Sequence, residues 1–350
     1  MLRLPPLLFS ALCLFALVSC APDADVVVYC SLDQEHSEEL IRRFEAETGL
    51  VVRAEFDTEA TKTIGLVGRL REEQSRVRCD VFWNNEIANT VALANEGLLQ
   101  SYDSPSAADI PPAFRDPANH WTGFAARARV FIVNTDLVSP EERATIRGMW
   151  DLLDPKWAGK VGMARPLTGT TLTHMTALYD VIGEAEAERY LTEVKAANER
   201  GELDLTSGNA TLMKKVRDGV LAWGWTDTDD YYVALDGGYP VDVIYPDQPT
   251  GAGDADALGT MVIPNALCLM AGAPNPDAGR RFIDWVLRPE IEADLAGSRT
   301  MQIPVRADVP RPAHVPSFGP GGRKAMQVDF VQAGKSLPER QQRLKELFVE

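Results

Sequence analysis

The sequence contains few of the residues and motifs on which enzymes depend. It has four histidines and five cysteines in 350 residues, and none of the histidines lies near a plausible nucleophile. It also has no Gly-x-Ser-x-Gly elbow, no His-Glu-x-x-His motif, no P-loop lysine motif and no dinucleotide-binding glycine fingerprint. Because a nucleophile, a base and an orienting group cannot be assembled from these residues, we expect a protein that is not an enzyme.

Positive charge is also scarce. The chain has 51 acidic and 35 basic side chains, which gives a formal net charge of −16. A surface with this charge repels nucleic acid and anionic lipid headgroups, so we expect neither as a partner. The length allows two or more compact domains, and the hydrophobic content of 45% is ordinary for a globular protein.

The N-terminal apolar run is too short for a relaxed membrane span, which needs about 20 residues. It extends over residues 4–18 after the single charge of Arg3, and this length is typical of a signal peptide. We therefore expect residues 1–19 to be removed on export, which puts the body of the protein outside the cytoplasm.

Cys20 closes the tetrad Leu-Val-Ser-Cys, which resembles the bacterial lipobox. The resemblance implies that Cys20 carries a lipid and starts the mature chain, with residues 20–25 as a polar tether. The lipid would then be the only membrane anchor, and the protein would face the periplasm or the cell exterior. A plain signal peptide cut near Ala21 is the alternative.

Three cysteines, Cys30, Cys79 and Cys268, remain once Cys13 leaves with the signal peptide and Cys20 is lipidated. Their spacing matches no zinc motif. Cys30 ends one predicted strand and Cys79 precedes another, so in parallel neighbouring strands the two sulfurs are too far apart for a disulfide. We expect all three thiols to be buried and reduced.

Strand and helix patterns alternate from residue 26 onward. Short β-branched runs predict buried parallel strands, and the amphipathic segments between them predict helices. Strands are expected at 26–29, 50–56, 80–83, 130–134, 161–164, 220–226, 241–245 and 260–270. Helices are expected from about 37, at 59–74, around 87–94, at 171–182, around 185–197, from about 209, at 276–287 and at 289–296. The order predicts two α/β lobes with ligands bound beyond the carboxyl ends of the strands.

Five segments resemble the periplasmic ferric-ion-binding proteins, which are extracellular solute-binding proteins of ABC importers. The resemblance covers residues 26–305 in the family's order. Its blocks are 127–136 (RARVFIVNTD), 150–163 (WDLLDPKWAGKVGM), 168–174 (TGTTLTH), 245–248 (YPDQ) and 259–265 (GTMVIPN). Five blocks in register are specific for the family. They are less specific for the ligand, because relatives of similar architecture bind phosphonates, sugar phosphates and other small anions.

The resemblance implies a two-lobed periplasmic-binding-protein fold of type II. Each lobe would be a mostly parallel sheet flanked by helices, with hinge crossovers between the lobes. Residues 26–126 and about 261–297 would form lobe 1, and residues 127–260 and about 298–350 would form lobe 2. The protein would be a monomer that delivers a small ligand to an ABC permease and its ATPase.

The family's metal ligands are a pair of tyrosines in lobe 2 and two residues from loops of lobe 1. The resemblance assigns them to Tyr231, Tyr232, His36 and Glu86. Phenolate and carboxylate oxygens suit Fe(III), a hard cation. The sequence departs from the pattern in its longer first loop, and an ungapped match places Asn85, not Glu86, at the acidic position.

These ligand candidates also have plain structural interpretations. Adjacent tyrosines on a strand face opposite ways, so only a turn or a helix start after residues 227–230 lets both reach one ion. The alternatives are an exposed His36 that opens a helix and a Glu86 whose charge stabilises a helix N-terminus.

Ferric-ion-binding proteins complete the coordination of iron with a small anion. An anion site needs backbone N–H groups at a helix N-terminus, short hydroxyls and an arginine. The alternatives are ordinary N-capping by the hydroxyls and a surface salt bridge for the arginines. The predicted anion or substrate site comprises Arg127, Arg129, Thr170, Thr171, Asn209 and Asp229.

We therefore predict a lipoprotein that closes over Fe(III) and a small anion, with no organic cofactor. The first alternative is a binding protein for a phosphonate, an organophosphate or another small anion, in which the arginines and hydroxyls form the site and the tyrosines only line it. The second is a ligand sensor for a membrane signalling partner.

Overall fold

The computed structural model describes residues 24–32, 34–57, 64–251, 254, 256–319 and 321–349. The expected signal peptide and Cys20 lie outside these residues. Within the described part of the chain, no helix is long and apolar enough to cross a membrane.

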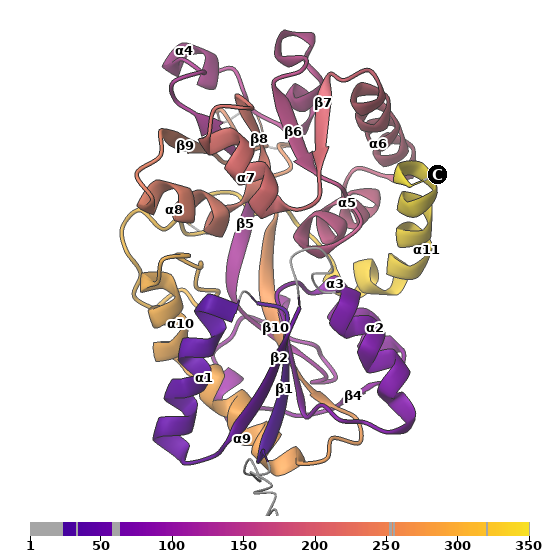
Figure 1. Cartoon of the computed structure of the whole chain (residues 1–350), viewed down its shortest axis with the longest axis vertical. Helices are drawn as coiled ribbons and strands as arrows, with labels where there is room; N and C mark the ends of the chain where they lie inside the picture. The colour runs from indigo at the N-terminus through magenta and orange to yellow at the C-terminus, as the bar shows by residue number, and fades with distance from the viewer. Residues whose placement is uncertain are drawn as a thin grey trace, which may run out of the picture.

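The first lobe is built on a parallel sheet with helices on both faces (Figure 1). Side chains alternate along its central strand: Val26 and Val28 pack with one group of helices, and Val27 and Tyr29 pack with the other. Its strands are β1 (Val26–Cys30), β2 (Val52–Phe56), β3 (Val81–Asn84) and β4 (Leu99–Gln100). Its helices are α1 (Gln34–Thr48), α2 (Ile64–Glu72), α3 (Ala88–Asn95), α9 (Pro276–Val286) and α10 (Pro289–Gly297).

Two long strands connect the lobes. β5 (Thr122–Asn134) pairs with β10 (Val262–Met270) along one half and with β8 (Trp223–Asp227) and β9 (Val241–Ile244) along the other. The β10 register shifts between Pro264 and Asn265, because proline cannot donate a ladder hydrogen bond. The main strand order is β2-β1-β3-β10-β5-β8-β6-β7, where β6 is Val161–Ala164 and β7 is Leu203–Thr206. β4 pairs with β10 and β9 with β5 beside this path, so both lobes share one continuous sheet through the crossovers.

The second lobe repeats the α/β plan. Its strands are β6 (Val161–Ala164), β7 (Leu203–Thr206), β8 (Trp223–Asp227) and β9 (Val241–Ile244). Its helices are α4 (Pro140–Arg143), α5 (Gly169–Val181), α6 (Glu184–Glu199), α7 (Asn209–Arg217) and α8 (Thr228–Asp236). Short 3-10 turns cover Glu73–Ser75, Pro105–Ala107, Pro112–Phe114, Met149–Leu153 and Pro155–Trp157.

The expected α/β architecture is confirmed, and so are the three buried free thiols of Cys30, Cys79 and Cys268. The last helix, α11 (Phe330–Phe348), was not expected from the sequence. It contains Pro338, which is exposed, and a proline normally argues against a helix interior. Although the domain prediction gives α11 to lobe 2, this helix contacts α3 of the first lobe as well as α5.

Gly224 on β8 and Gly162 on β6 let the second sheet pack tightly. They are direct neighbours in the parallel register, and a methyl group on Gly224 would overlap the carbonyl oxygen of Gly162 and crowd Leu212. Backbone atoms cannot move aside as a flexible side chain can, so the strand spacing here depends on glycine.

We predict that Gly224→Ala lowers the free energy of unfolding by about 2–3 kcal/mol, because the strands must separate to admit the methyl group. Chemical denaturation measures this change. The control is Gly68→Ala in the interior of α2, where a methyl group meets no atom within 4 Å. That substitution should raise stability by up to about 1 kcal/mol through helix propensity. Equal effects of the two substitutions would contradict the close packing described for β6 and β8.

Candidate ligand-binding site

A small polar cavity of about 40 Å³ lies where the two lobes meet. It sits beyond the carboxyl ends of three strands: Asn85 follows β3, Ala164 ends β6 and Asp227 ends β8. This is the position expected for a ligand in such sheets. The cavity is lined by Asn85, Arg127, Ala164, Thr168, Gly169, Thr170, Thr171, Gly208, Asn209, Ala210, Asp227, Asp229 and Asp230.

Two helix N-termini border the cavity. α5 begins at Gly169, so Thr170 and Thr171 lie in its first turn, and α7 begins at Asn209. The N-cap residues Thr168 and Gly208 make no side-chain hydrogen bond to their helices. The N–H groups of these first helical turns and the helix dipoles therefore create a positive potential that suits a small anion.

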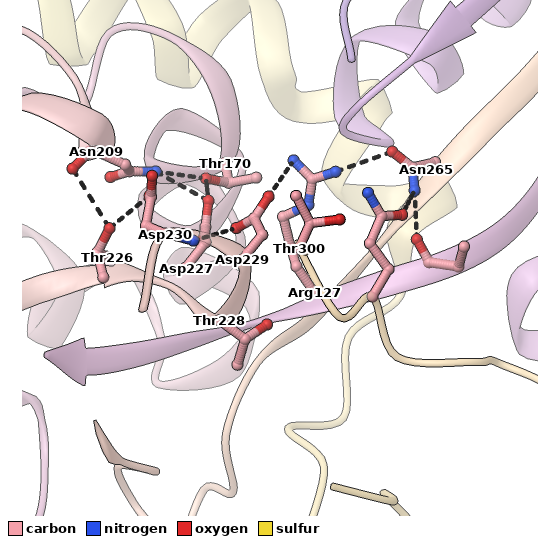
Figure 2. A network of polar contacts seen from close by, with 12 residues as sticks. Arg127, Thr170, Asn209, Thr226, Asp227, Thr228, Asp229, Asp230, Asn265 and Thr300 are labelled. Atoms are coloured by element: carbon pink, nitrogen blue, oxygen red, sulfur yellow. Dashed lines mark hydrogen bonds and ion pairs between the residues drawn. The ribbon is translucent and has the colours of Figure 1, made fainter. Parts of the chain in front are cut away.

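A buried ion pair lies directly behind the cavity. The Arg129 side chain is fully buried, and its Nη1 atom donates to Asp227 Oδ1 at 2.7 Å. Asp227 Oδ2 also accepts hydrogen bonds from Thr170 Oγ1 at 2.5 Å and from Asn209 Nδ2 at 2.9 Å (Figure 2). Arg129 in turn donates to the hydroxyls of Thr170 and Thr171 at 3.3 and 3.2 Å. The predicted residues Arg129, Thr170, Thr171 and Asn209 thus form one network.

Arg127 faces the cavity itself. It lies two residues before Arg129 on β5 and is 2% exposed. Its Nη2 atom donates to Asn265 Oδ1 at 2.9 Å, and its Nη1 atom is 3.5 Å from Asp229 Oδ2 (Figure 2). The surface-salt-bridge alternative for the two arginines is therefore wrong, because both guanidinium groups are buried, that of Arg127 at the cavity and that of Arg129 behind it.

Three carboxylates gather at the junction of β8 and α8. One oxygen of each of Asp227, Asp229 and Asp230 lies within 4.8 Å of the other two. They come close because the strand ends at Asp227 and the next residues form the first turn of a helix. Thr226 Oγ1 donates to Asp230 at 2.6 Å and holds that carboxylate in place. Anionic oxygens at this spacing suit a hard cation.

Tyr231 and Tyr232 lie on the same helix but outside this cavity. They are 7% and 2% exposed, their ring centroids are 5.0 Å apart, and Tyr232 Oη donates to the carbonyl oxygen of His314 at 2.9 Å. They line a separate depression with Tyr245 and Arg323. Burial, with a contribution from Asp242, raises the pKa of Tyr231 to about 12, and burial also raises the pKa of Tyr232. Both phenols are therefore neutral at pH 7 in this arrangement.

Glu86 does not line the cavity either. Its fully buried carboxylate accepts hydrogen bonds from the backbone N–H groups of Ala88 and Asn89 at 2.7 and 3.1 Å, at the start of α3. Thr173 Oγ1 on α5 donates to it across the lobes at 2.6 Å. Burial raises the pKa of this carboxyl. The neighbouring Asn85 lines the cavity instead, at the position that the ungapped match indicated.

His36 lies in the first turn of α1, which begins at Gln34, earlier than the expected helix start; its side chain is outside the described part of the chain. The structure therefore brings together the predicted anion-site residues, and it brings Tyr231 and Tyr232 together at a different place. Asp227 and Asp230 were not among the predicted site residues. Their position directly after a strand was the available signal, because that is the ligand-binding edge of an α/β sheet.

Residues 39–317 match the family model of bacterial extracellular solute-binding proteins. The match spans most of the chain, so the chain belongs to this family. It is 26% identical over 312 residues to iron uptake protein A1 of Synechocystis sp., a match that covers 84% of this chain and 79% of the relative. It is 25% identical over 249 residues to a putative 2-aminoethylphosphonate-binding periplasmic protein of Salmonella typhi, covering 70% and 67%.

The fold is similar to that of a ferric binding protein from Campylobacter jejuni. The two structures align with a TM-score of 0.78 at 22% identity, over 92% of this chain and 99% of the other. The expected type II periplasmic-binding-protein fold is confirmed.

We predict that Asp227→Asn lowers the free energy of unfolding by about 3 kcal/mol, because it leaves the buried Arg129 guanidinium without its counter-charge. The matched control is Asp218→Asn, which removes the same charge from an exposed pair with Arg217. That pair should contribute less than about 1 kcal/mol. Urea denaturation of both variants measures the two changes in the free energy of unfolding. Decreases of similar size would show that the buried pair stabilises the fold no more than the exposed pair does.

Proposed function

We propose that this member of the bacterial extracellular solute-binding proteins is the substrate-binding component of an ABC importer, and that its cargo is ferric iron with a small anion. The observation that carries the proposal is the meeting of opposite charges in one cavity. The carboxylates provide oxygen ligands for the metal, and Arg127 together with the two helix N-termini provides a binding site for the anion. The iron-related names of several relatives support the same cargo.

Charge balance explains why an anion would be needed. Asp227, Asp229 and Asp230 supply three negative charges, and Arg127 and Arg129 supply two positive charges. The site is therefore close to neutral before Fe(III) enters. A trivalent cation would leave an uncompensated positive charge in a nearly closed space, which is costly unless an anion enters with it. Arg127, Thr171 and Asn209 lie where that anion would bind.

Two ligand sets compete for the metal within this proposal. Asp229 and Asp230 border the cavity, while the predicted set of Tyr231, Tyr232, Glu86 and His36 requires the first turns of α8 to turn toward the lobe interface. The spectra of the two sets differ. Phenolate bound to Fe(III) absorbs visible light through charge transfer, whereas carboxylate ligands give no comparable visible band.

We expect the chelator-treated protein to bind iron from ferric citrate without a strong visible band. The double variant Asp229→Asn, Asp230→Asn should bind about a hundredfold more weakly, because each carboxylate contributes a charged contact to the cation. The double variant Tyr231→Phe, Tyr232→Phe should bind as the wild type does. Metal analysis after gel filtration, with an absorption spectrum of each sample, gives both readouts. A broad visible band that disappears in the tyrosine variant would instead identify the phenols as ligands.

An aminoalkylphosphonate is the second candidate cargo. The 3.5 Å approach of Arg127 to Asp229 places a cation and an anion side by side, as a small zwitterion requires. The phosphonate would bind Arg127 and the helix N-termini, and the ammonium group would bind the carboxylates. If 2-aminoethylphosphonate raises the melting temperature, Arg127→Met abolishes that rise and ferric citrate has no effect, the cargo is the zwitterion and the iron proposal fails.

We further propose that Cys20 anchors the mature chain through a lipid, as its lipobox-like tetrad indicates. Mass spectrometry of the protein extracted from membranes should show a lipid-modified N-terminal peptide that begins at Cys20. Cys20→Ser should leave the protein either unprocessed or released from the membrane. An unmodified N-terminus at Ala21 or beyond would rule out the anchor and leave the binding proposal intact.

A further inference from the structure

Helix α11 packs on both lobes away from the hinge strands. It contacts α3 of the first lobe and α5 and α6 of the second (Figure 1). Its buried side chains Phe330, Leu337 and Leu344 belong to the same continuous apolar cluster as Val91 of α3 and Leu178 of α5. The two lobes cannot part near the ligand cavity without disturbing this packing.

The attachment of α11 to the second lobe is polar and directional. Arg340 forms a two-pronged ion pair with Asp180 of α5 at 2.5 and 2.6 Å, and it also donates to the carbonyl oxygen of Thr176 at 3.0 Å. Arg343 pairs with Glu188 of α6 at 2.8 and 2.9 Å. Paired guanidinium–carboxylate contacts fix orientation as well as distance. They hold α11 in a set position on α5 and α6.

The attachment of α11 to the first lobe is apolar. Gly334 lies so close to α3 that a methyl group there would overlap Val91 and touch the carbonyl oxygen of Ala88. The described residues of α11 and α3 form no hydrogen bond or ion pair with each other. Apolar packing is not directional, so this face can separate and re-form without breaking specific pairs.

The first-lobe helix α3 and the second-lobe helix α5, which both contact α11, are also joined directly to each other beside the cavity. Thr173 of α5 donates to Glu86 at the start of α3, and Thr173 lies one turn after the cavity residues Thr170 and Thr171. A buried hydrogen bond therefore joins α3 and α5 directly, and α11 joins them indirectly because it packs on both helices. Both contacts join the two lobes in this structure.

We propose that α11 is an interlobe strap, which stays on the second lobe when the protein opens and releases α3, so that the α11–α3 contact sets how firmly the lobes close over the cargo. This inference rests on the proposed binding function for its physiological meaning. Its physical content is independent of which ligand binds, because the contact stabilises the closed form even without cargo. A strap of this kind raises the affinity for the cargo because it raises the fraction of molecules that are in the closed form.

Distances between spin labels test which lobe α11 follows. Cysteines would replace exposed Lys335 on α11, Gln74 on the first lobe and Glu193 on α6, with Cys13 and Cys20 changed to serine. The three native thiols of Cys30, Cys79 and Cys268 are buried and would not react. With ferric citrate or 2-aminoethylphosphonate, the 335–74 distance should shorten and narrow, while the 335–193 distance stays constant. A change in the 335–193 distance alone would overturn the proposal.

Gly334→Ala tests the strength of the strap. The added methyl group should push α11 off α3, lengthen the 335–74 distance in the ligand-free protein and weaken binding of the cargo that the wild type accepts by about tenfold. Lys345→Ala, an exposed substitution on the same helix that leaves the label at position 335 in place, should change neither quantity. If Gly334→Ala prevents folding, the variant Arg340→Met is used in its place. It removes the ion pair that fixes α11 on α5, so we expect a broader distribution of the 335–193 distance. A Gly334→Ala protein that matches Lys345→Ala in both readouts would overturn the proposal. If neither probe binds but Gly334→Ala still opens the ligand-free protein, the strap stands and the assigned cargo falls.

Discussion

The buried ion pair between Arg129 and Asp227 is the contact on which the site depends. It joins the crossover strand β5 to the end of β8, and the Asp227 carboxylate also holds Thr170 of α5 and Asn209 of α7. Four elements that are distant in sequence therefore meet at one carboxylate. A buried charge must be compensated, so none of these partners can move independently without a large cost. This constraint fixes the positions of the residues that line the cavity in front of the pair.

The geometry of α8 separates two groups of residues that are adjacent in the chain. Helical rotation places Asp229 and Asp230 at the cavity and directs Tyr231 and Tyr232 to the depression beside Tyr245. The sequence places all four within a few residues, and only the exact start of the helix decides which of them reach the ligand. Successive residues of a helix are rotated by about 100°, so the two positions between each acid and each phenol turn their side chains to different sides of α8.

Much of the fold could be predicted because buried parallel strands and amphipathic helices leave strong periodic patterns. The anion-site residues were predictable for a related reason, since hydroxyls at helix starts and alternating arginines on a strand have a defined direction. Glu86 was harder, because the carboxylate of Glu86 and the amide of Asn85 are neighbours in a loop and tertiary packing alone decides which one lines the cavity. Helix α11 was missed because Pro338 and a largely polar surface hide its buried stripe.

The lining of the cavity has a kinetic consequence. Asn85 is its contribution from the first lobe, while Arg127 comes from the crossover strand and the other lining residues from the second lobe. A ligand can therefore meet nearly all of its polar partners on the second lobe before the first lobe covers it. The rate of capture would then be governed by an open, preformed surface. The residence time would be governed by Asn85 and the interlobe contacts, so evolution could lengthen or shorten retention of the cargo without altering its recognition.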